Sequence, residues 1–211
     1  MTDTYILQLK AAAAHLAAHD PVLGTVIARS ALPTMRPHHE YYRSLVQSII
    51  NQQLSTKAAD SIERRFLELF GGSFPAPEAI LAKSVDELRG AGLGRAKATY
   101  IRDLAAHVID GKVRFDHLDG LSNEAISREL TDVKGIGAWT VHMFLMFCMG
   151  RLDVLPVGDL GIRGGIKKLY GLAETPSPQQ VAEIAAQRHW HPYESVASWY
   201  IWQSLDNTPA V

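Results

Sequence analysis

Two glycines separated by one residue, Gly135-Ile136-Gly137, stand where one helical pattern ends and the next begins. Glycine permits positive φ and a close approach of the backbone to another group. A helix that starts at such a turn presents unpaired N–H groups and the positive end of its dipole. This geometry binds a phosphate without a basic side chain. The flanking residues, Val133 before the glycines and Thr140 in the first helical turn, favour phosphate binding over an ordinary glycine turn.

Asp159 is the carboxylate of greatest chemical interest downstream of this turn. It precedes a helix predicted to begin at Leu160, so it has the position and residue type of an N-cap. A carboxylate in a water-poor site also stabilises the positive charge that develops on a sugar when an N-glycosidic bond breaks. Taken alone, the capping interpretation is the stronger one, and Asp153 is a nearby competitor for the chemical role.

The elements that must position these residues are almost all helical, and the predicted fold class is all-α. Short helices are predicted after Pro75, after the capping-box sequence that starts at Ser84, and after Ser122. Lys112–Phe115 is the only candidate strand. Apolar residues at helical spacing predict the other helices at residues 4–18, 40–51, 56–70, 95–109, 137–149, 160–170, 177–187 and 193–205.

The chain has 211 residues, which suits a single compact unit of two helical lobes. We expect lobes at approximately residues 40–110 and 111–206, with the N-terminal helices of residues 1–35 packing against one of them. One cysteine, Cys148, excludes an intramolecular disulfide and a Cys-rich zinc or iron–sulfur site. No apolar run reaches the length of a membrane span, and no signal peptide is evident, so we expect a cytoplasmic protein.

The glycine turn and the Asp159 loop together resemble the helix–hairpin–helix DNA glycosylase superfamily. The segments Ser48–Ala59 and Trp190–Trp202 are similar to its AlkA-like branch, the 3-methyladenine DNA glycosylases II. The four blocks occur in family order over roughly residues 36–206. Some members of that branch carry an additional N-terminal β-sheet domain, and the roughly 40 residues before the first block are too few for one.

The resemblance implies an enzyme that binds double-stranded DNA, flips an alkylated base and cuts its N-glycosidic bond, initiating base excision repair. It implies that Asp159 is the catalytic carboxylate. An alkylated purine is already cationic and leaves readily, so one carboxylate suffices. Trp139 stands where bifunctional relatives have a lysine, so we expect a monofunctional enzyme without lyase activity. The single Cys148 also excludes the four-cysteine cluster of relatives similar to endonuclease III.

The resemblance also assigns residues that would contact the base and the duplex. Trp139, Trp202 and Met143 match positions of the base pocket, where Met143 replaces an aromatic residue. Trp199 and Trp202 are three residues apart on one predicted helix, and we expect at least one of them to belong to the core. Two further departures from the family pattern, Glu194 in an arginine position and Gln203 in a tyrosine position, leave the preferred alkylated bases open.

In the family, the position of Gln53 is a wedge that fills the gap left by the flipped base, and Gln52 lies beside it. Composition alone would make both glutamines surface or capping residues. The residues expected to contact the DNA backbone are Gly135, Ile136, Gly137 and Thr140.

The same turn holds a monovalent cation in the family through backbone carbonyls. The matching carbonyls belong to Thr131, Val133 and Ile136, and we expect a sodium or potassium ion there. No cofactor is required for the expected reaction, and the nine histidines show no spacing typical of a metal site.

Two other classes of function compete with a glycosylase. A non-catalytic helix–hairpin–helix DNA-binding module of a repair accessory protein would use the glycine turn but needs neither Asp159 nor the tryptophans. A helical protein-interaction domain explains the apolar stripes but not the glycines. We therefore expect a monomeric enzyme whose partner is double-stranded DNA with alkylated bases, associated with the nucleoid through DNA and with no membrane.

The formal net charge of −1 conceals an uneven distribution. Residues 83–114 contain seven basic and four acidic residues, and residues 134–168 contain five basic and two acidic ones, so each window has a net charge of +3. A locally basic face suits DNA that is held mainly by backbone N–H groups. It predicts a modest dependence of binding on salt concentration.

Overall fold

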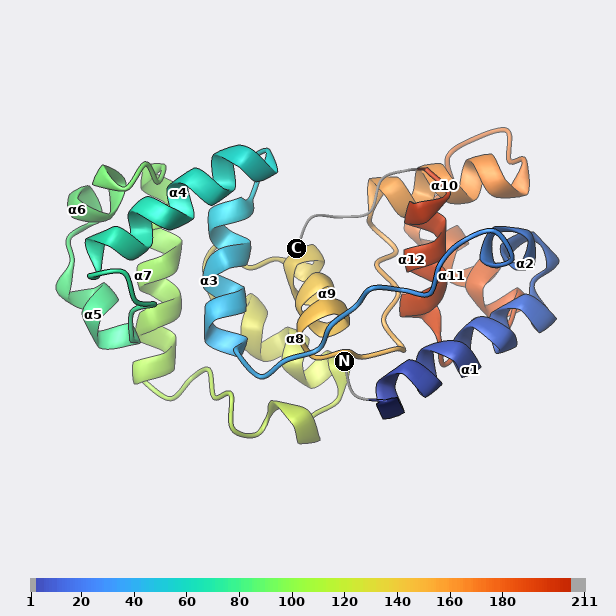
Figure 1. Ribbon diagram of the computed structural model, residues 1–211, viewed down its shortest axis with the longest axis horizontal. Coiled ribbons are helices and arrows are strands. Elements are labelled where there is room, and N and C mark those ends of the chain that lie inside the picture. The colour runs from blue at the N-terminus through green and yellow to red at the C-terminus, as the bar shows by residue number, and fades with distance from the viewer. Residues whose placement is uncertain (1–2, 206–211) are drawn as a thin grey trace. The chain divides into compact units, whose positions relative to one another are not determined.

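Residues 3–205 are described by a computed structural model, and their regular elements are all helical (Figure 1). The all-α prediction is confirmed. Serine caps explain where several helices begin, since the Ser55, Ser84, Ser122 and Ser177 hydroxyls each accept from the N–H three residues on. The helices are α1 (Asp3–His19), α2 (Pro21–Ile27), α3 (Tyr41–Asn51), α4 (Thr56–Leu69), α5 (Pro77–Ala82), α6 (Val85–Gly90), α7 (Arg95–Ile109), α8 (Asn123–Thr131), α9 (Ala138–Met143), α10 (Leu160–Tyr170), α11 (Pro178–Gln187) and α12 (Glu194–Gln203), with a 3₁₀ turn at Leu118–Gly120.

The segment predicted as a strand, Lys112–Phe115, is irregular, and that prediction is wrong. Residues 3–205 contain no strand at all. The N–H groups of Lys112 and Val113 donate to the His107 carbonyl at the end of α7, at 2.9 and 3.1 Å. The Arg114 N–H donates to Glu129 Oε1 of α8 at 2.8 Å. Helix-terminal and side-chain acceptors therefore take the hydrogen bonds that a strand partner would receive.

The described chain divides into two compact units of helices. The hairpin unit contains His39–Phe144, and the terminal unit contains the residues up to His38 and those from Leu145 onward. The N-terminal helices thus group with the C-terminal ones, but the division lies at Phe144/Leu145 instead of near residue 110. The physical reason is that α8 and α9 pack with each other, and the turn between them is hydrogen-bonded to Asp103 of α7 and to Gln52, the residue after α3.

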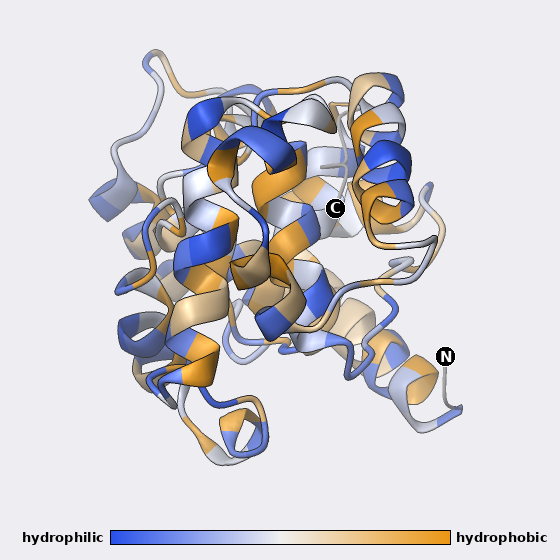
Figure 2. Cartoon of the chain, turned by 90° about the vertical axis from the view of Figure 1, so that its left-hand side faces the viewer, coloured by the Kyte–Doolittle hydropathy of each residue, from blue (hydrophilic) through white to orange (hydrophobic). Residues whose placement is uncertain are grey.

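The hairpin unit is built around α3 and α7, which bury one face each. Figure 2 shows hydrophilic and hydrophobic residues alternating along the turns of the helices, as amphipathic helices require. α4, α5 and α6 pack on these two helices. The buried residues are Tyr41, Leu45, Val46, Ile49 and Ile50 of α3 and Ala98, Ile101, Leu104 and Ala105 of α7.

The terminal unit is built around α12, whose residues Ser195–Trp202 are all buried. A helix that is buried all round is the centre of a core and not a surface element. α1, α2 and α10 pack against it. No helix within residues 3–205 has the length and apolarity needed to cross a bilayer.

The helix α2 is absent from the sequence prediction, which places no separate helix at residues 21–27. Asp20 ends α1 and also caps α2, because its Oδ1 accepts from the N–H groups of Val22 and Leu23 at 3.0 and 3.2 Å. Its other oxygen, Oδ2, accepts from Trp190 Nε1 at 2.9 Å and from the Tyr170 hydroxyl. Asp20 is fully buried, so these four donors replace the water that its carboxylate loses.

The helix predicted over residues 137–149 is divided in the structure. α9 ends at Met143 and continues as a π-helical segment, Phe144–Cys148. The division between the two units falls within this segment, after Phe144. Short π-helical segments inside α-helices occur frequently at functional sites.

Candidate active site

Asp159 caps α10 and at the same time binds a tryptophan. Its Oδ1 accepts from the Ile162 N–H at 2.8 Å and from Trp202 Nε1 at 2.9 Å. The capping interpretation is therefore correct, and the same oxygen also makes a contact that no cap requires. Asp159 is half-buried at the positive end of the α10 dipole, whereas its competitor Asp153 is exposed. Two N–H donors on one oxygen fix the plane of the carboxylate.

Trp202 is positioned by the core of the terminal unit. Its side chain lies on α12 with 1% exposure, and its ring stacks with Phe147 at a centroid distance of 6.2 Å. The rigid indole thus presents its N–H to Asp159 from a fixed direction. Trp199 is also buried, and its ring packs edge-on against Tyr200 at 5.2 Å. At least one of these two tryptophans is expected to belong to the core, and Trp199 does. Trp202 is also packed in the core and in addition contacts the candidate carboxylate.

Gly161 provides the space for this contact, and sequence reasoning missed it. A Cβ at residue 161 would lie 3.0 Å from Asp159 Oδ1 and 3.1 Å from Trp202 Nε1. These distances are shorter than most real Cβ contacts, so any larger side chain would press on the hydrogen bond between Asp159 and Trp202. The only signal in the sequence is a glycine two residues after the carboxylate, in the first turn of a helix.

The two family departures at the ends of α12 have different surroundings. Glu194 is largely buried, with its side chain 14% exposed, and its Oε1 lies 3.0 Å from His191 Nδ1. Its other oxygen, Oε2, is buried without a hydrogen-bond partner within residues 3–205. Gln203 is half-buried in the last turn of α12.

The glycine turn between α8 and α9 has the geometry that its sequence predicts. Gly135 has φ +83°, and a Cβ there would lie 2.1 Å from Tyr100 Cδ2 of α7. Gly137 is the N-cap of α9, and it has no side chain that could accept a hydrogen bond from the N–H groups of the first turn. Ile136 and Thr140 are buried, with 3% and 6% exposure. Gly135 is thus required by packing and backbone conformation, whereas nothing in the protein lies within 4 Å of a Cβ at Gly137.

The carbonyls expected to hold a cation lie in the same turn. The Ile136 N–H donates to the Val133 carbonyl at 3.1 Å, which closes a turn. A carbonyl oxygen has two lone pairs, so this bond leaves Val133 able to accept a second ligand. Thr131 is the last residue of α8, where helix carbonyls lack intrahelical partners. Residues 3–205 contain no cluster of three His, Cys, Asp or Glu side chains suited to a metal.

The two glutamines expected to act on the duplex differ in their surroundings. Gln53 is exposed and has φ +56°, an uncommon backbone conformation for a residue with a side chain. Leu54, beside it, is 37% exposed. Gln52 is half-buried, and its Nε2 donates to the Gly135 carbonyl at 2.8 Å. Gln53 therefore has the exposure of a wedge, whereas the Gln52 side chain binds within the protein.

The pocket candidates belong to both units. Trp139 lies in the first turn of α9 and is 46% exposed, and Met143 lies one turn further on with 2% exposure. Both belong to the hairpin unit, whereas Asp159 and Trp202 belong to the terminal unit. Trp139 is one of the few large aromatic side chains of the described residues to be so exposed.

The basic residues of the 83–114 window are largely paired with neighbouring carboxylates. Their ion pairs are Lys83 with Glu87, Arg89 and Arg95 with Asp86, Lys112 with Asp110, and Arg114 with Asp116. Hydrogen bonds from the N-cap backbone and side chain of Ser84 lower the pKa of Glu87 to about 2. Five of the seven basic residues in this window therefore have a carboxylate partner, and the other two, Lys97 and Arg102, donate to backbone carbonyls.

Comparison with known proteins decides the family. Residues 46–190 match the model of the HhH-GPD superfamily of base excision DNA repair proteins. The chain belongs to this superfamily. The resemblance to helix–hairpin–helix DNA glycosylases is thus confirmed, and the matched region includes the Gln52-Gln53 turn, the hairpin turn and the Asp159 loop.

Several individual HhH-GPD proteins match over most of their length. The chain is 36% identical over 170 residues to DNA-3-methyladenine glycosylase 1 of Schizosaccharomyces pombe, covering 78% of this chain and 72% of that protein. A crystal structure of a Bacillus halodurans DNA-3-methyladenine glycosidase superposes with a TM-score of 0.80 at 39% identity, covering 90% of this chain and 86% of that one. The S. pombe 3-methyladenine DNA glycosylase Mag1 bound to abasic DNA superposes with a TM-score of 0.78 at 30% identity, covering 95% and 98%.

Proposed function

We propose that this HhH-GPD protein is a monofunctional DNA glycosylase that excises alkylated, cationic purines such as 3-methyladenine. The observation that carries the proposal is the carboxylate of Asp159, fixed by the Ile162 N–H and Trp202 Nε1. The relatives named DNA-3-methyladenine glycosylase support the choice of base. A protein that only binds DNA has no need for an indole aimed at a carboxylate.

The chemistry follows from the charge of the substrate. When the N-glycosidic bond breaks, its electron pair moves to the base nitrogen and neutralises the cationic purine, and positive charge develops on the sugar. Asp159 stabilises that charge electrostatically. Water then adds to the sugar carbon and loses a proton, which leaves an intact abasic strand. Because Trp202 and Ile162 orient the carboxylate before the reaction, little reorganisation is needed in the transition state.

The remaining predicted residues take roles that suit their surroundings. The exposed Trp139 offers a π-face to a cationic base, and Met143 and Trp202 keep the base-pocket assignment that the family resemblance gives them. Gly135, Ile136, Gly137 and Thr140 form the turn that approaches the DNA backbone, and Gln53 is the wedge. A sodium or potassium ion on the Thr131, Val133 and Ile136 carbonyls would supply a positive charge beside a phosphate. A monomeric state and a cytoplasmic location stay predictions.

The substitution Asp159→Asn tests the catalytic role. Asparagine caps a helix as well as aspartate and still accepts from Trp202, so the free energy of unfolding should change by less than about 0.5 kcal/mol. Excision should fall by at least about 100-fold, the loss typical of removing a key electrostatic contact. The measurement is the number of alkali-labile sites formed in methylated duplex DNA, with DNA binding measured in parallel. Release of methylated bases at the wild-type rate would refute the assignment.

The same experiment separates the enzyme from its alternative, a non-catalytic DNA-binding module. If the wild-type chain binds duplex DNA but forms no alkali-labile sites in methylated DNA, the module interpretation holds.

The absence of lyase activity has its own test. A lyase of this type needs an amine that forms a Schiff base with the sugar. Trp139 occupies that position, and the nearby Lys134 lies on the other side of the glycines with its Nζ 3.4 Å from Asp103 Oδ1. Incubation with abasic duplex and borohydride should therefore trap no covalent adduct, and a trapped adduct would contradict monofunctionality.

A further inference from the structure

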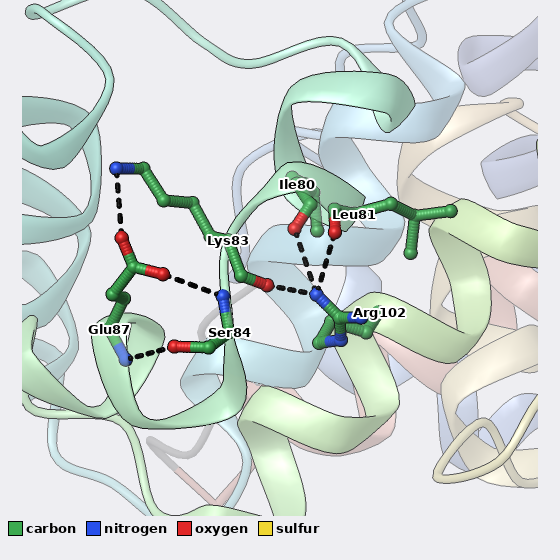
Figure 3. A network of polar contacts seen from close by, with 6 residues as sticks. All are labelled: Ile80, Leu81, Lys83, Ser84, Glu87 and Arg102. Atoms are coloured by element: carbon green, nitrogen blue, oxygen red, sulfur yellow. Dashed lines mark hydrogen bonds and ion pairs between the residues drawn. The ribbon is translucent and has the colours of Figure 1, made fainter.

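α7 carries two cations that each reach the carbonyls at the end of another helix. Arg102 Nη1 donates to the Leu81 carbonyl at 3.0 Å, to the Ile80 carbonyl at 3.4 Å and to the Lys83 carbonyl (Figure 3). These groups end α5 and connect it to the capped start of α6. A cation at a helix C-terminus satisfies orphan carbonyls and interacts well with the helix dipole. Arg102 thus has a structural role at the junction of α5 and α6.

Lys97 precedes Arg102 on α7 and makes the equivalent contact with carbonyls at the end of α3. Its Nζ donates to the Ile50 carbonyl at 2.8 Å and to the Gln52 carbonyl at 2.5 Å. Partial burial lowers the pKa of Lys97. One of these two carbonyls, that of Gln52, directly precedes Gln53, which has φ +56°. A non-glycine residue in this conformation needs support from its surroundings, and Lys97 provides it.

The turn at Gln52-Gln53 is also hydrogen-bonded to the hairpin turn. Gln52 Nε2 donates to the Gly135 carbonyl at 2.8 Å. Gly135 in turn packs against Tyr100, and the Lys134 N–H donates to Asp103 Oδ2 at 2.9 Å. The α7 residues that make these contacts are three positions apart, so they share one face of the helix: Lys97, Tyr100 and Asp103.

We propose that Lys97 and Gln52 are positioning residues that hold the Gln53 turn in register with the hairpin turn. This inference rests on the proposed function, in which Gln53 is a wedge and the hairpin binds the DNA backbone. Both turns are fixed to each other and to α7. The distance between the wedge and the phosphate-binding hairpin turn is therefore set before DNA binds. Such preorganisation improves binding by reducing the ordering cost of the complex. Neither side chain needs to contact DNA itself.

Two variants remove the contacts separately, and a third is the matched control. Lys97→Met keeps the aliphatic stem but removes the ammonium group, and Gln52→Leu removes the donor to Gly135. Arg102→Met removes a comparable cation from comparable carbonyls on the same helix, away from the wedge. The probes are an undamaged duplex and the same duplex with a tetrahydrofuran abasic site, with 2-aminopurine opposite that site. Neither probe requires base excision.

Lys97→Met should reduce the preference for the abasic duplex about tenfold, the usual weight of a hydrogen bond from a charged group, and Gln52→Leu should reduce it about fivefold, the weight of a neutral one. Affinity for undamaged duplex should stay within about twofold, because the hairpin glycines remain. The 2-aminopurine response on binding should fall in both variants. Arg102→Met should lower the melting temperature and leave the preference unchanged. Lys97→Arg should restore the preference, because it restores a cation at the carbonyls.

A double-mutant cycle with Gln53→Ala decides whether Lys97 acts through the wedge. In the Gln53→Ala background, Lys97→Met should change the preference by less than about twofold, since no wedge remains to be positioned. An unchanged tenfold effect would overturn the proposal. So would an equal loss on both duplexes with a reduced salt dependence, because that result identifies Lys97 as a phosphate contact. If Lys97→Met does not fold, Gln52→Leu carries the same test. A wild-type chain that binds DNA with a preference for the abasic site but excises no base would refute the proposed function without refuting the positioning role.

Discussion

At the scale of single residues, the carboxylate of Asp159 depends on a neighbour that has no side chain. Gly161 leaves the space through which Trp202 Nε1 reaches Asp159 Oδ1 at 2.9 Å. Hydrogen-bond strength falls steeply as distance and angle depart from their optimum. The geometry of the site is therefore sensitive to one methyl group at residue 161.

Gly161→Ala should slow base excision about tenfold, because the added Cβ displaces either the indole or the carboxylate from the productive geometry. The measurement is the single-turnover rate on a methylated duplex. Gly164→Ala is the matched control in the same helix, since nothing lies within 4 Å of its Cβ. It should leave the rate unchanged and raise the free energy of unfolding by about 0.5–1 kcal/mol, as alanine does in a helix. Equal rates for both variants would show that the contact between Asp159 and Trp202 does not matter for catalysis.

The sequence predicts the residue types of this site but not their orientation. Asp159 is recognisable because it follows a Gly/Pro-containing loop at a helix start, and capping is a local property. That Trp202 directs its N–H to the capping oxygen depends on how α10 and α12 pack, 43 residues apart in the chain. The different environments of Gln52 and Gln53 have the same origin, because the Gly135 carbonyl that binds Gln52 lies 83 residues away.

At the scale of elements, the two glycines of the hairpin turn differ in whether the protein's own structure requires a glycine. Gly135 has φ +83° and lies under the ring of Tyr100, so the protein itself requires it. Gly137 has φ −100°, which any residue adopts, and open space around its Cβ position. Nothing inside the hairpin unit explains why residue 137 is a glycine, whereas a phosphate approaching the α9 N-terminus would.

The two glycines can be separated by alanine substitution. Gly135→Ala should destabilise the protein by at least about 1–3 kcal/mol, through positive φ and the clash with Tyr100. Gly137→Ala should change the free energy of unfolding by less than about 1 kcal/mol, the weight of a changed N-cap. It should nevertheless weaken binding to undamaged duplex about tenfold or more, because the new Cβ would separate the backbone from a phosphate. Thermal melts and titrations of both variants are the measurements, and full DNA affinity in Gly137→Ala would contradict phosphate binding at this turn.

Helix positions are predictable here wherever the signal is local. Serine caps and apolar periodicity place most helix ends within one or two residues of the expected positions. The exceptions are instructive. Asp20 ends α1 and also caps α2, a helix that is not among the predicted ones. The π-helical segment after α9 and the irregular path of Lys112–Phe115 depend on tertiary partners, which periodicity does not reveal.

At the scale of the whole molecule, the order of the chain does not match the division into units. The terminal unit combines both ends of the described chain, and the hairpin unit is the continuous segment between them. A boundary based on the position of a loop near residue 110 could not find this division, because the turn between α8 and α9 is held to α7 and to the residue after α3 by contacts distant in sequence. The Gln53 turn and the hairpin turn thus belong to one unit, and Asp159 and Trp202 belong to the other.

The net charge of −1 and the many local ion pairs predict how binding depends on salt. Each cation that neutralises a phosphate contributes a slope of about −0.9 to log K against log salt concentration, whereas a backbone N–H displaces fewer counterions. We expect a slope no steeper than about −3 for undamaged duplex between about 50 and 200 mM KCl. Gly137→Ala should shift this line to weaker affinity without changing its slope, since the variant loses no charge. A slope steeper than about −6 would instead require a basic surface that makes most of the phosphate contacts, and the hairpin turn would then not be the main anchor.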